Sequence, residues 1–209
     1  DQVSSFNTAQ IRAIESRDVI GFTTAQIVQM DSSHFAALTT SQIAALTTSQ
    51  VRTIDPEDLF GLSAAQRIAL TSAQIHAMTA DQFSALNTTQ VRAIQTRDIA
   101  GMKAEQVQAM NSAQVNALST AQMAMFSITQ LQGFEAEDMA GFTTLQLRAI
   151  AASRIRAFAA DQIAGLDATQ ISGFNTAQIQ ALSAFQIQNI EVADLAGLTT
   201  IQMIAMNSS

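Results

Sequence analysis

An eight-residue repeat runs through almost the whole chain and constrains its fold more than any other feature. Starting at Asn7, the 209-residue sequence divides into 25 consecutive octads that end at Met206 without insertion or deletion. The segment 38–54, LTTSQIAALTTSQVRTI, contains one octad and its near copy. Residues 1–6 and 207–209 are parts of flanking octads. Self-similarity at a fixed period indicates one structural unit used many times.

Each position of the octad has a fixed chemical character. The fifth and eighth positions are apolar throughout, except that Arg67 occupies one fifth position. The fourth position is Gln in 18 octads, and all eight glycines stand at the seventh position. The other residues at the fourth position are Asp18, Asp58, Asp98, Asp138, Asp194, His34 and Arg154. Because each residue type keeps its position in the octad, the repeat is not a random low-complexity sequence.

The first and fourth positions together predict a helix start in every octad. The first position is mostly Thr, Ser, Asn, Asp or Glu, which we interpret as the N-cap of a helix. Gln three residues later completes a capping box, and apolar residues before the cap and four after it form a hydrophobic staple. Pro56 directly follows Asp55 and occupies the first helical position, where its missing N–H is harmless. We therefore predict one helix of six or seven residues per octad.

Two other folds fit the repeat less well. Eight residues advance an α-helix about 80° beyond two full turns, so one continuous helix would wind its apolar stripe around the axis. In a β-solenoid the fifth and eighth positions would lie on opposite faces of a strand. Because isolated short helices are marginal in water, the octads must stack. The sequence predicts an all-α fold, a thin α-solenoid in which glycine marks close contact or helix termination.

Length and composition favour one continuous array over residues 1–209. No linker rich in Pro, Gly or Ser interrupts the repeat. Because the sequence starts at Asp1 in the middle of an octad, we expect an excised piece of a longer protein. The absence of cysteine excludes disulfides, and no stretch has the run of about 18 apolar residues that a membrane span needs. We expect no membrane insertion.

The charge of the chain limits its partners. The formal net charge is −7 with only ten Lys and Arg residues, whereas nucleic-acid binding depends on basic residues that neutralise phosphates. We therefore expect no nucleic-acid partner. A surface rich in Thr, Ser, Ala and Gln is typical of secreted bacterial repeat regions, so we expect an extracellular or cell-surface location.

Acidic variants of the octad recur with a longer period. Four of them, 15–22, 55–62, 95–102 and 135–142, lie 40 residues apart, and a fifth spans 191–198. With two octads per superhelical turn they would alternate between sides, and with about 2.5 they would form one stripe, which we favour. The candidate interaction stripe consists of Glu15, Asp18, Asp55, Glu57, Asp58, Asp98, Glu135, Glu137, Asp138, Glu191 and Asp194.

Other polar residues have simple structural interpretations. His34 replaces a capping Gln, and His76 stands at an outward variable position. We expect Arg67 to extend its aliphatic stem outward to an acid such as Asp58, with Ile68 turned inward. The acidic octads lack the spaced ligand loop of calcium sites and suit the first helical turn. We expect no catalytic residue, no cofactor and no metal site.

The octads resemble two kinds of known repeat. LTTSQIAAL and MTADQFSAL look like the octapeptide arrays of very large bacterial surface or secreted adhesin-like proteins, which implies a repetitive, non-enzymatic architecture. FNTAQIRAI (6–14) and LNTTQVRAI (86–94) are similar to the first helix of transcription activator-like effector repeats. That family has a longer repeat with a base-reading loop, so we interpret the similarity as a shared capping box.

These observations support three hypotheses about function, none of them enzymatic. The first is a spacer or stalk in a large bacterial extracellular or surface protein. The second is a protein- or glycan-binding adhesion module that uses the acidic stripe. The third is a segment that assembles head to tail with itself, because no terminal octad looks capped as solenoid ends usually are.

Overall fold

The computed structural model describes residues 3–59 and 61–206, and every helix in this part of the chain is short. The chain forms two compact units, residues 1–102 and 103–209, each of which has its own core. Within the described residues there is no β-strand, which confirms the predicted all-α class. Each unit is an α-solenoid of octads. The prediction of one continuous array across both units stays a prediction.

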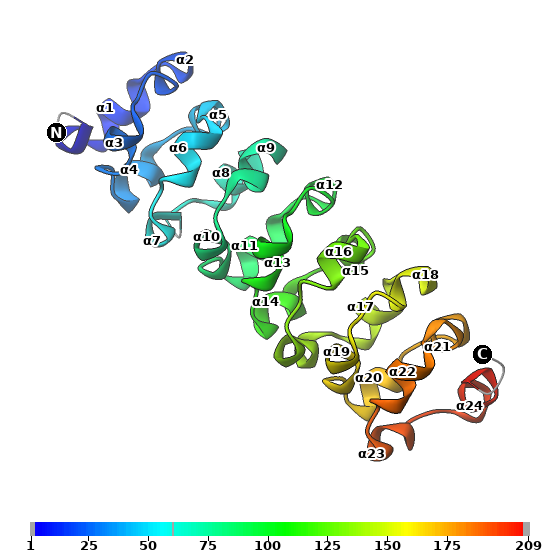
Figure 1. Cartoon of the computed structure of the whole chain (residues 1–209). Helices are drawn as coiled ribbons and strands as arrows, with labels where there is room; N and C mark the ends of the chain where they lie inside the picture. Colours follow the sequence, from blue (N-terminus) through cyan, green and yellow to red (C-terminus); the bar gives the residue numbers. More distant parts are fainter. Residues whose placement is uncertain (1–2, 60, 207–209) are drawn as a thin grey trace. The chain divides into compact units, whose positions relative to one another are not determined.

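The described residues of the first unit, 3–59 and 61–102, form one 3-10 helix and twelve α-helices, mostly one per octad (Figure 1). Their bounds are η1 Val3–Ser5, α1 Thr8–Ala13, α2 Ser16–Val19, α3 Thr24–Ile27, α4 Ser32–Ala37, α5 Thr40–Ala45, α6 Thr48–Arg52, α7 Pro56–Leu59, α8 Ala64–Ala69, α9 Ser72–Ala77, α10 Ala80–Ser84, α11 Thr88–Ala93 and α12 Thr96–Ile99.

The second unit repeats this pattern. Its helices are α13 Ala104–Gln108, α14 Ser112–Ala117, α15 Thr120–Met123, α16 Ile128–Leu131, η2 Ala136–Gly141, α17 Thr144–Ala149, α18 Ala152–Ile155, α19 Ala160–Ala164, α20 Ala168–Ser172, α21 Thr176–Ala181, α22 Ala184–Gln188, α23 Val192–Leu195 and α24 Thr200–Met206.

The predicted capping box starts most of these helices. In α5, the Oγ1 of Thr39 accepts a hydrogen bond from the N–H of Gln42 at 3.2 Å, and the Gln42 Oε1 accepts one from the Thr39 N–H at 2.6 Å. Pro56 begins α7, as its sequence position predicts. Many helices are shorter than the predicted six or seven residues, because four-residue helices such as α2 and α3 end in tight turns.

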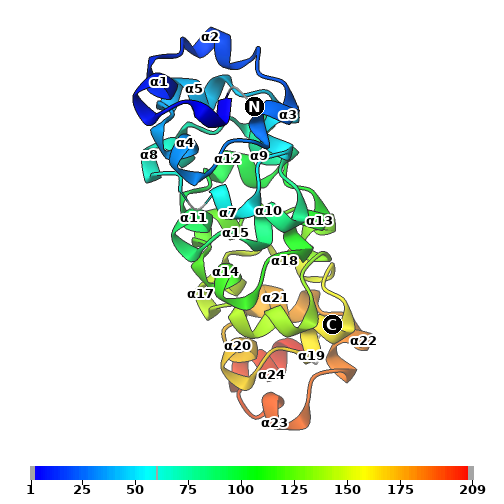
Figure 2. The same cartoon turned by 90° about the vertical axis from the view of Figure 1, so that its left-hand side faces the viewer.

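The helices wind around each unit with about three and a half octads per turn. In the first unit α1, α2 and α3 lie on different sides, and α4 returns to pack beside α1 (Figure 2). Side-chain amides bond carbonyl groups 28 residues earlier, as Gln42 does with Ile14, and 28 residues are 3.5 octads. The predicted value of about 2.5 octads per turn is therefore wrong.

Gln at the fourth position holds successive turns together. The Nε2 of Gln42 donates to the carbonyl groups of Ile11 and Ile14, at 2.8 and 2.7 Å. Its Oε1 completes the capping box of α5. One amide therefore bonds carbonyl groups at the end of α1 and an N–H group at the start of α5. Gln178 does the same in the second unit, with Leu147 and Ile150 as its acceptors. Burial of the glutamine amide costs little free energy, because both its oxygen and its nitrogen have hydrogen-bond partners. The main-chain groups that it bonds would destabilise the fold if they were buried without a partner.

The fifth and eighth positions form the core of each unit, as predicted. Ile43 and Leu46 are nearly inaccessible to solvent in the first unit. In the second unit the core contains an aromatic row, in which the ring of Phe134 lies 5.3 Å from Phe126 and 5.0 Å from Phe142. The latter pair is edge to face, an arrangement that the ring quadrupoles favour.

Glycine at the seventh position marks close contact between turns. A Cβ added at Gly61 would come within 2.9 Å of the Ser32 carbonyl oxygen, and one added at Gly165 within 2.6 Å of that of Ala136. Neither glycine has a positive φ, so backbone freedom does not explain it. The close approach of the helix three octads earlier excludes a side chain here. The predicted role of glycine in contact is confirmed.

Candidate functional site

The acidic octads fold into α2, α7 and α12 in the first unit and into η2 and α23 in the second. At the fourth position each carries Asp in place of Gln. An ionised carboxylate accepts hydrogen bonds but donates none. These octads therefore cannot bond the carbonyl groups that Gln bonds elsewhere.

Three of these Asp side chains, Asp58, Asp98 and Asp138, instead contact the helix that starts three octads earlier. Asp98 Oδ1 accepts a hydrogen bond from the Ser72 hydroxyl. The backbone N–H groups of Ser32 and Ser112 lie near the carboxyl groups of Asp58 and Asp138 and act to lower the pKa of each. We refer to each of these contacts as an Asp clasp.

Glycine of the same octad completes the Asp clasp. Gly61 lies against Ser32, and Gly141 lies against Ser112, so Asp and Gly of one D-x-x-G segment hold one serine. The serines Ser32, Ser72 and Ser112 are 40 residues apart, as are the Asp residues that bind them. From Asp58 to Asp138, the 40-residue rhythm therefore places a carboxyl group beside the N-terminus of a packed helix.

Burial perturbs two of these carboxylates. Burial is the largest cause that raises the pKa of Asp58 above its usual value, and the nearby Asp55 and Asp31 raise it further. The pKa of Asp138 is raised for the same reasons, first by burial and then by the charge of Glu135. In both cases the N–H groups of the clasp act in the opposite direction. The folded protein therefore binds a proton at these sites more tightly than the unfolded chain does.

This difference gives a stability prediction. Because its folded pKa is raised, the contribution of Asp138 is fully present below its unfolded pKa and is lost as pH rises through the folded pKa. The variant Glu135→Gln removes the second cause and should lower the pKa of Asp138 without restoring its usual value. Carboxyl NMR titration measures this pKa, and urea unfolding at several pH values measures the stability. Glu191→Gln, at the same octad position, should leave Asp138 unchanged; an equal shift in both variants would contradict the assignment.

The remaining acids of the predicted stripe lie at the surface. Glu15, Asp18, Asp55, Glu57, Glu135, Glu137 and Glu191 are exposed or half-buried, Asp58 and Asp194 are half-buried, and Asp98 and Asp138 are buried. Glu15 lies 2.8 Å from the guanidinium of Arg17, an exposed pair that contributes little. Glu15, Glu135 and Glu191 stand at the predicted N-cap position, but their side chains make no capping hydrogen bond.

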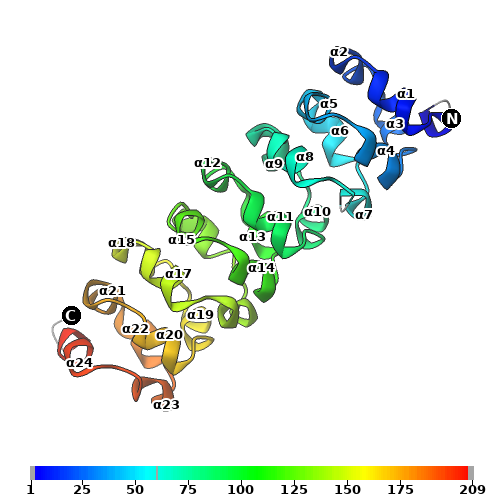
Figure 3. The same ribbon diagram turned by 180° about the vertical axis from the view of Figure 1, so that it is seen from behind.

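The structure does not bring the acidic octads of the first unit into one row. Helix α2 packs against α5, α7 against α4 and α10, and α12 against α9. Figures 1 and 3 both show α2 and α12 on one edge of this unit and α7 on the opposite edge. With 28 residues per turn, a 40-residue step is about 1.4 turns, which reverses the side. The preference for a single stripe is wrong within this unit.

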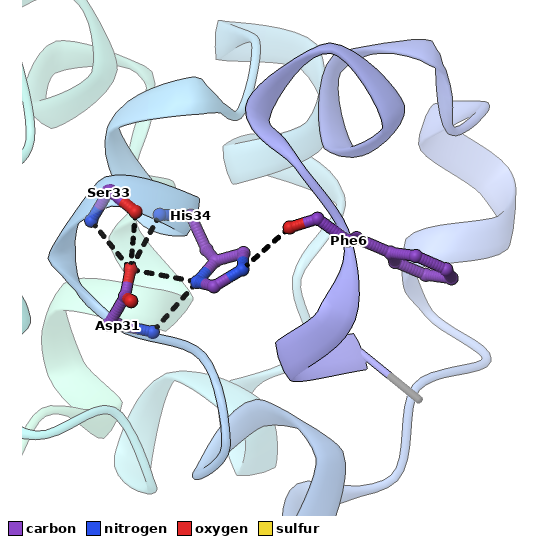
Figure 4. A network of polar contacts seen from close by, with 4 residues as sticks. All are labelled: Phe6, Asp31, Ser33 and His34. Carbon is purple, nitrogen blue, oxygen red and sulfur yellow. Dashed lines mark hydrogen bonds and ion pairs between the residues drawn. The ribbon is translucent and has the colours of Figure 1, made fainter. Parts of the chain in front are cut away.

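His34 takes over both tasks of Gln (Figure 4). Its Nδ1 lies 3.2 Å from the backbone nitrogen of Asp31, and its Nε2 lies 3.0 Å from the Phe6 carbonyl oxygen, 28 residues earlier. The Phe6 carbonyl oxygen can only accept, so Nε2 donates to it, and Nδ1 also lies 2.8 Å from Asp31 Oδ1. The buried ring thus has the structural position that the sequence indicates.

The cap of this helix has an unusual carboxylate. Asp31 Oδ1 accepts hydrogen bonds from the hydroxyl of Ser33 at 2.6 Å and from the N–H of His34 at 3.1 Å. These bonds, that of Ser33 first, lower the pKa of Asp31 to about 2. The charged cap therefore persists in all but strongly acidic solution.

A second set of polar contacts between turns, made by side chains at the sixth octad position, was not predicted. His76 Nε2 lies 2.9 Å from the Asp98 carbonyl oxygen, and its ring fills the space beside Gly101. In the second unit Asn116 Nδ2 donates to the Gly141 carbonyl oxygen, and Arg156 Nε to that of Ala181. The sixth position is variable in the sequence, and only the recurrence of donors there could have indicated these ties.

Arg67 behaves differently from its expected role. Ile68 is 54% exposed and does not turn inward, and the Arg67 guanidinium donates to the Leu62 carbonyl oxygen instead of reaching Asp58. The Arg67 Nε is buried without a hydrogen-bond partner. A cavity of about 30 Å³ lies beside this side chain among leucine and isoleucine residues of the first unit. An arginine at a core position thus disturbs the packing locally.

The described residues offer no metal site and no membrane span. Residues 3–59 and 61–206 contain no group of three or more His, Asp or Glu side chains placed to hold a metal ion. Over the same residues, no helix combines the length and apolar character needed to cross a membrane.

Comparison with known proteins found one family. The ALTTAQ repeat matches the chain three times in tandem, at residues 11–48, 51–88 and 91–127. These matches cover more than half of the chain, and their starts are 40 residues apart, the same five-octad period as the Asp clasps. No curated protein matches the chain.

Proposed function

Because the chain belongs to the family of ALTTAQ-repeat proteins, we propose that it is a non-enzymatic structural region. It would act as a spacer or stalk in a large bacterial protein that is extracellular or attached to the cell surface. Repeat arrays in which each unit contacts only its neighbours suit this task, because length grows with repeat number.

One observation carries this proposal: the conspicuous polar side chains serve contacts between turns. Sixteen of the 18 fourth-position glutamines are buried, and the buried Asp98 and Asp138 belong to Asp clasps. Polar groups held in this way stiffen an array and are not available to a substrate. Binding or catalytic sites usually present polar groups that converge on an open pocket.

Small-angle scattering of the 209-residue chain tests the proposal. A spacer should scatter as a rod, with a cross-section of one solenoid and a length that increases when further octads are added. A chain lengthened by a second copy of residues 103–142 should add length without adding width. A compact globular profile, or a length unchanged by this insertion, would overturn the spacer proposal.

The adhesion hypothesis stays a prediction, to be tested on the acids outside the clasps. Glu15, Glu57 and Glu137 can be changed to Gln while the Asp, Ser and Gly residues of the Asp clasps are kept. If these exposed acids recognise a partner, the triple variant should lose binding to a cationic surface while it keeps its circular dichroism spectrum. If the triple variant still binds, Glu15, Glu57 and Glu137 are excluded as the recognition surface.

A further inference from the structure

One arginine occupies a core position inside the first unit. Arg67 stands at the fifth position of its octad, where the other octads carry an apolar residue. Its helix α8 is nevertheless regular, because Ser63 and Gln66 form the usual capping box. The Gln66 Nε2 also donates to the carbonyl groups of Phe35 and Leu38, as glutamines at this position do elsewhere. The octad therefore packs like the others, and only the Arg67 side chain differs.

The guanidinium group of Arg67 is held in place but keeps one donor without a partner. One of its terminal nitrogens donates to the Leu62 carbonyl oxygen. Elsewhere in the array, a carbonyl group at the eighth octad position accepts from the glutamine 28 residues later. Here that glutamine is Gln90, whose Nε2 donates to the Leu59 carbonyl oxygen at 3.0 Å. Arg67 thus takes the acceptor that the repeat provides for Gln90, while its own Nε is buried without a hydrogen-bond partner.

Arg67 also lines a small cavity in the core of the first unit. The volume of this cavity is about 30 Å³, which is about the volume that one water molecule occupies in the liquid. Apart from Arg67 and Gln90, the described residues around it are apolar, among them Leu70, Ile75 and Met78. All of them belong to residues 59–94, in the interior of the array.

No carboxylate among the described residues balances the charge of Arg67. None of their ion pairs includes Arg67, and no Asp or Glu lines the cavity. The guanidinium group of arginine is always charged, and a charge that is buried without a partner destabilises the fold. A bound anion would remove this cost. The site can exchange an ion with solvent, because Arg67 as a whole is only half-buried.

The polar groups around the cavity favour an anion over a water molecule. An internal water makes about three hydrogen bonds and needs acceptors for its own hydrogen atoms. Gln90 is already bonded at both ends of its amide, since its Oε1 accepts from the Asn87 N–H at 2.7 Å and its Nε2 donates to Leu59. Arg67 can only donate. A halide ion needs donors and a positive charge, and Arg67 supplies both.

We propose that the cavity binds one halide ion, which accepts a hydrogen bond from the Arg67 Nε. Chloride is close to a water molecule in size and fits the cavity, whereas sulfate and phosphate are larger. The bound ion stabilises the first unit, because it compensates the one arginine at a core position. This inference does not depend on the spacer proposal, because a spacer keeps its shape with or without the ion.

Diffraction from crystals soaked in sodium bromide tests the proposal directly. One anomalous-scattering peak should lie within hydrogen-bond distance of the Arg67 Nε. The variant Arg67→Leu restores an apolar fifth position and should lose this peak. Arg52→Leu is the matched control, since Arg52 is an exposed arginine of the same unit, and it should keep the peak. A wild-type cavity that is empty or holds water, or a peak that persists in Arg67→Leu, would overturn the proposal.

Unfolding in solution gives a second readout. Bromide is raised while sodium sulfate is lowered, so that the ionic strength stays constant. Once the site is saturated, each tenfold rise in bromide should raise the ratio of folded to unfolded first unit about tenfold. Arg67→Leu should show only the general effect of exchanging the salts, and circular dichroism checks that it is helical. An equal response of wild type and Arg67→Leu to bromide would contradict the proposal.

Discussion

Replacement of Gln178 by leucine should destabilise the second unit by about 3–5 kcal/mol, because three main-chain groups lose a buried partner. Gln178 Oε1 accepts from the Asn175 N–H at 2.9 Å, and its Nε2 donates to the carbonyl groups of Leu147 and Ile150 at 2.8 and 2.7 Å. The side chain is completely buried, so water cannot replace these bonds. Leucine fills a similar volume but supplies no polar atom.

Urea unfolding measures this loss, and amide hydrogen exchange locates it. Exchange is needed because repeat arrays can unfold in parts, and one free energy of unfolding is then poorly defined. Protection should fall first in α17 and α21, which contribute the bonded groups.

Gln26→Leu is the matched control for this prediction. Gln26 makes the same capping box, and its Oε1 lies 2.8 Å from the backbone nitrogen of Thr23. No described residue accepts from its Nε2. Its replacement should therefore cost only about 1 kcal/mol, in dilute solution. Equal losses in both variants would mean that the ties between turns contribute nothing beyond the cap.

Replacement of Gly141 by alanine should cost about 2–3 kcal/mol, although alanine normally favours helices. An added Cβ would overlap the carbonyl oxygen and Cα of Ser112, and both are backbone atoms that cannot rotate away. The Asp clasp between Asp138 and Ser112 would have to open to relieve this overlap. Thermal unfolding and the carboxyl titration of Asp138 should change together.

Gly21→Ala is the comparison for Gly141. Gly21 has the same place in an acidic octad, but the nearest atom to an added Cβ is the carbonyl oxygen of Asp18 in its own turn, at 3.2 Å. Its replacement should change stability by less than about 0.5 kcal/mol. A loss as large as that at Gly141 would show that the helix itself requires glycine, and not the contact between turns.

The sequence alone determined the local structure of this protein. The capping box joins residues three apart, and Thr39 with Gln42 therefore predicts a helix start without knowledge of any neighbour. The core positions follow in the same way, since Ile43 and Leu46 recur at fixed distances from the cap. The contact role of glycine could also be predicted. All eight glycines stand at the seventh octad position, which indicates that this position has the same surroundings in each of these octads.

The tertiary structure decided how many octads make a turn, and the sequence did not contain that number in local form. The angle between successive helices depends on packing against helices three and four octads away, as α2 packs against α5. The prediction of a single acidic stripe failed for this reason.

The same dependence hid the functions of particular side chains. The glutamine Nε2 donates to carbonyl groups 28 and 31 residues earlier, and this role could be recognised only from the packing of successive turns. The same holds for the Asp clasps, where Asp98 meets Ser72 over 26 residues. Capping depends on a few bonds within one octad, whereas partners in another turn depend on the summed geometry of every octad between them. The sequence therefore determined the octad, and the packing of its copies determined which residues meet.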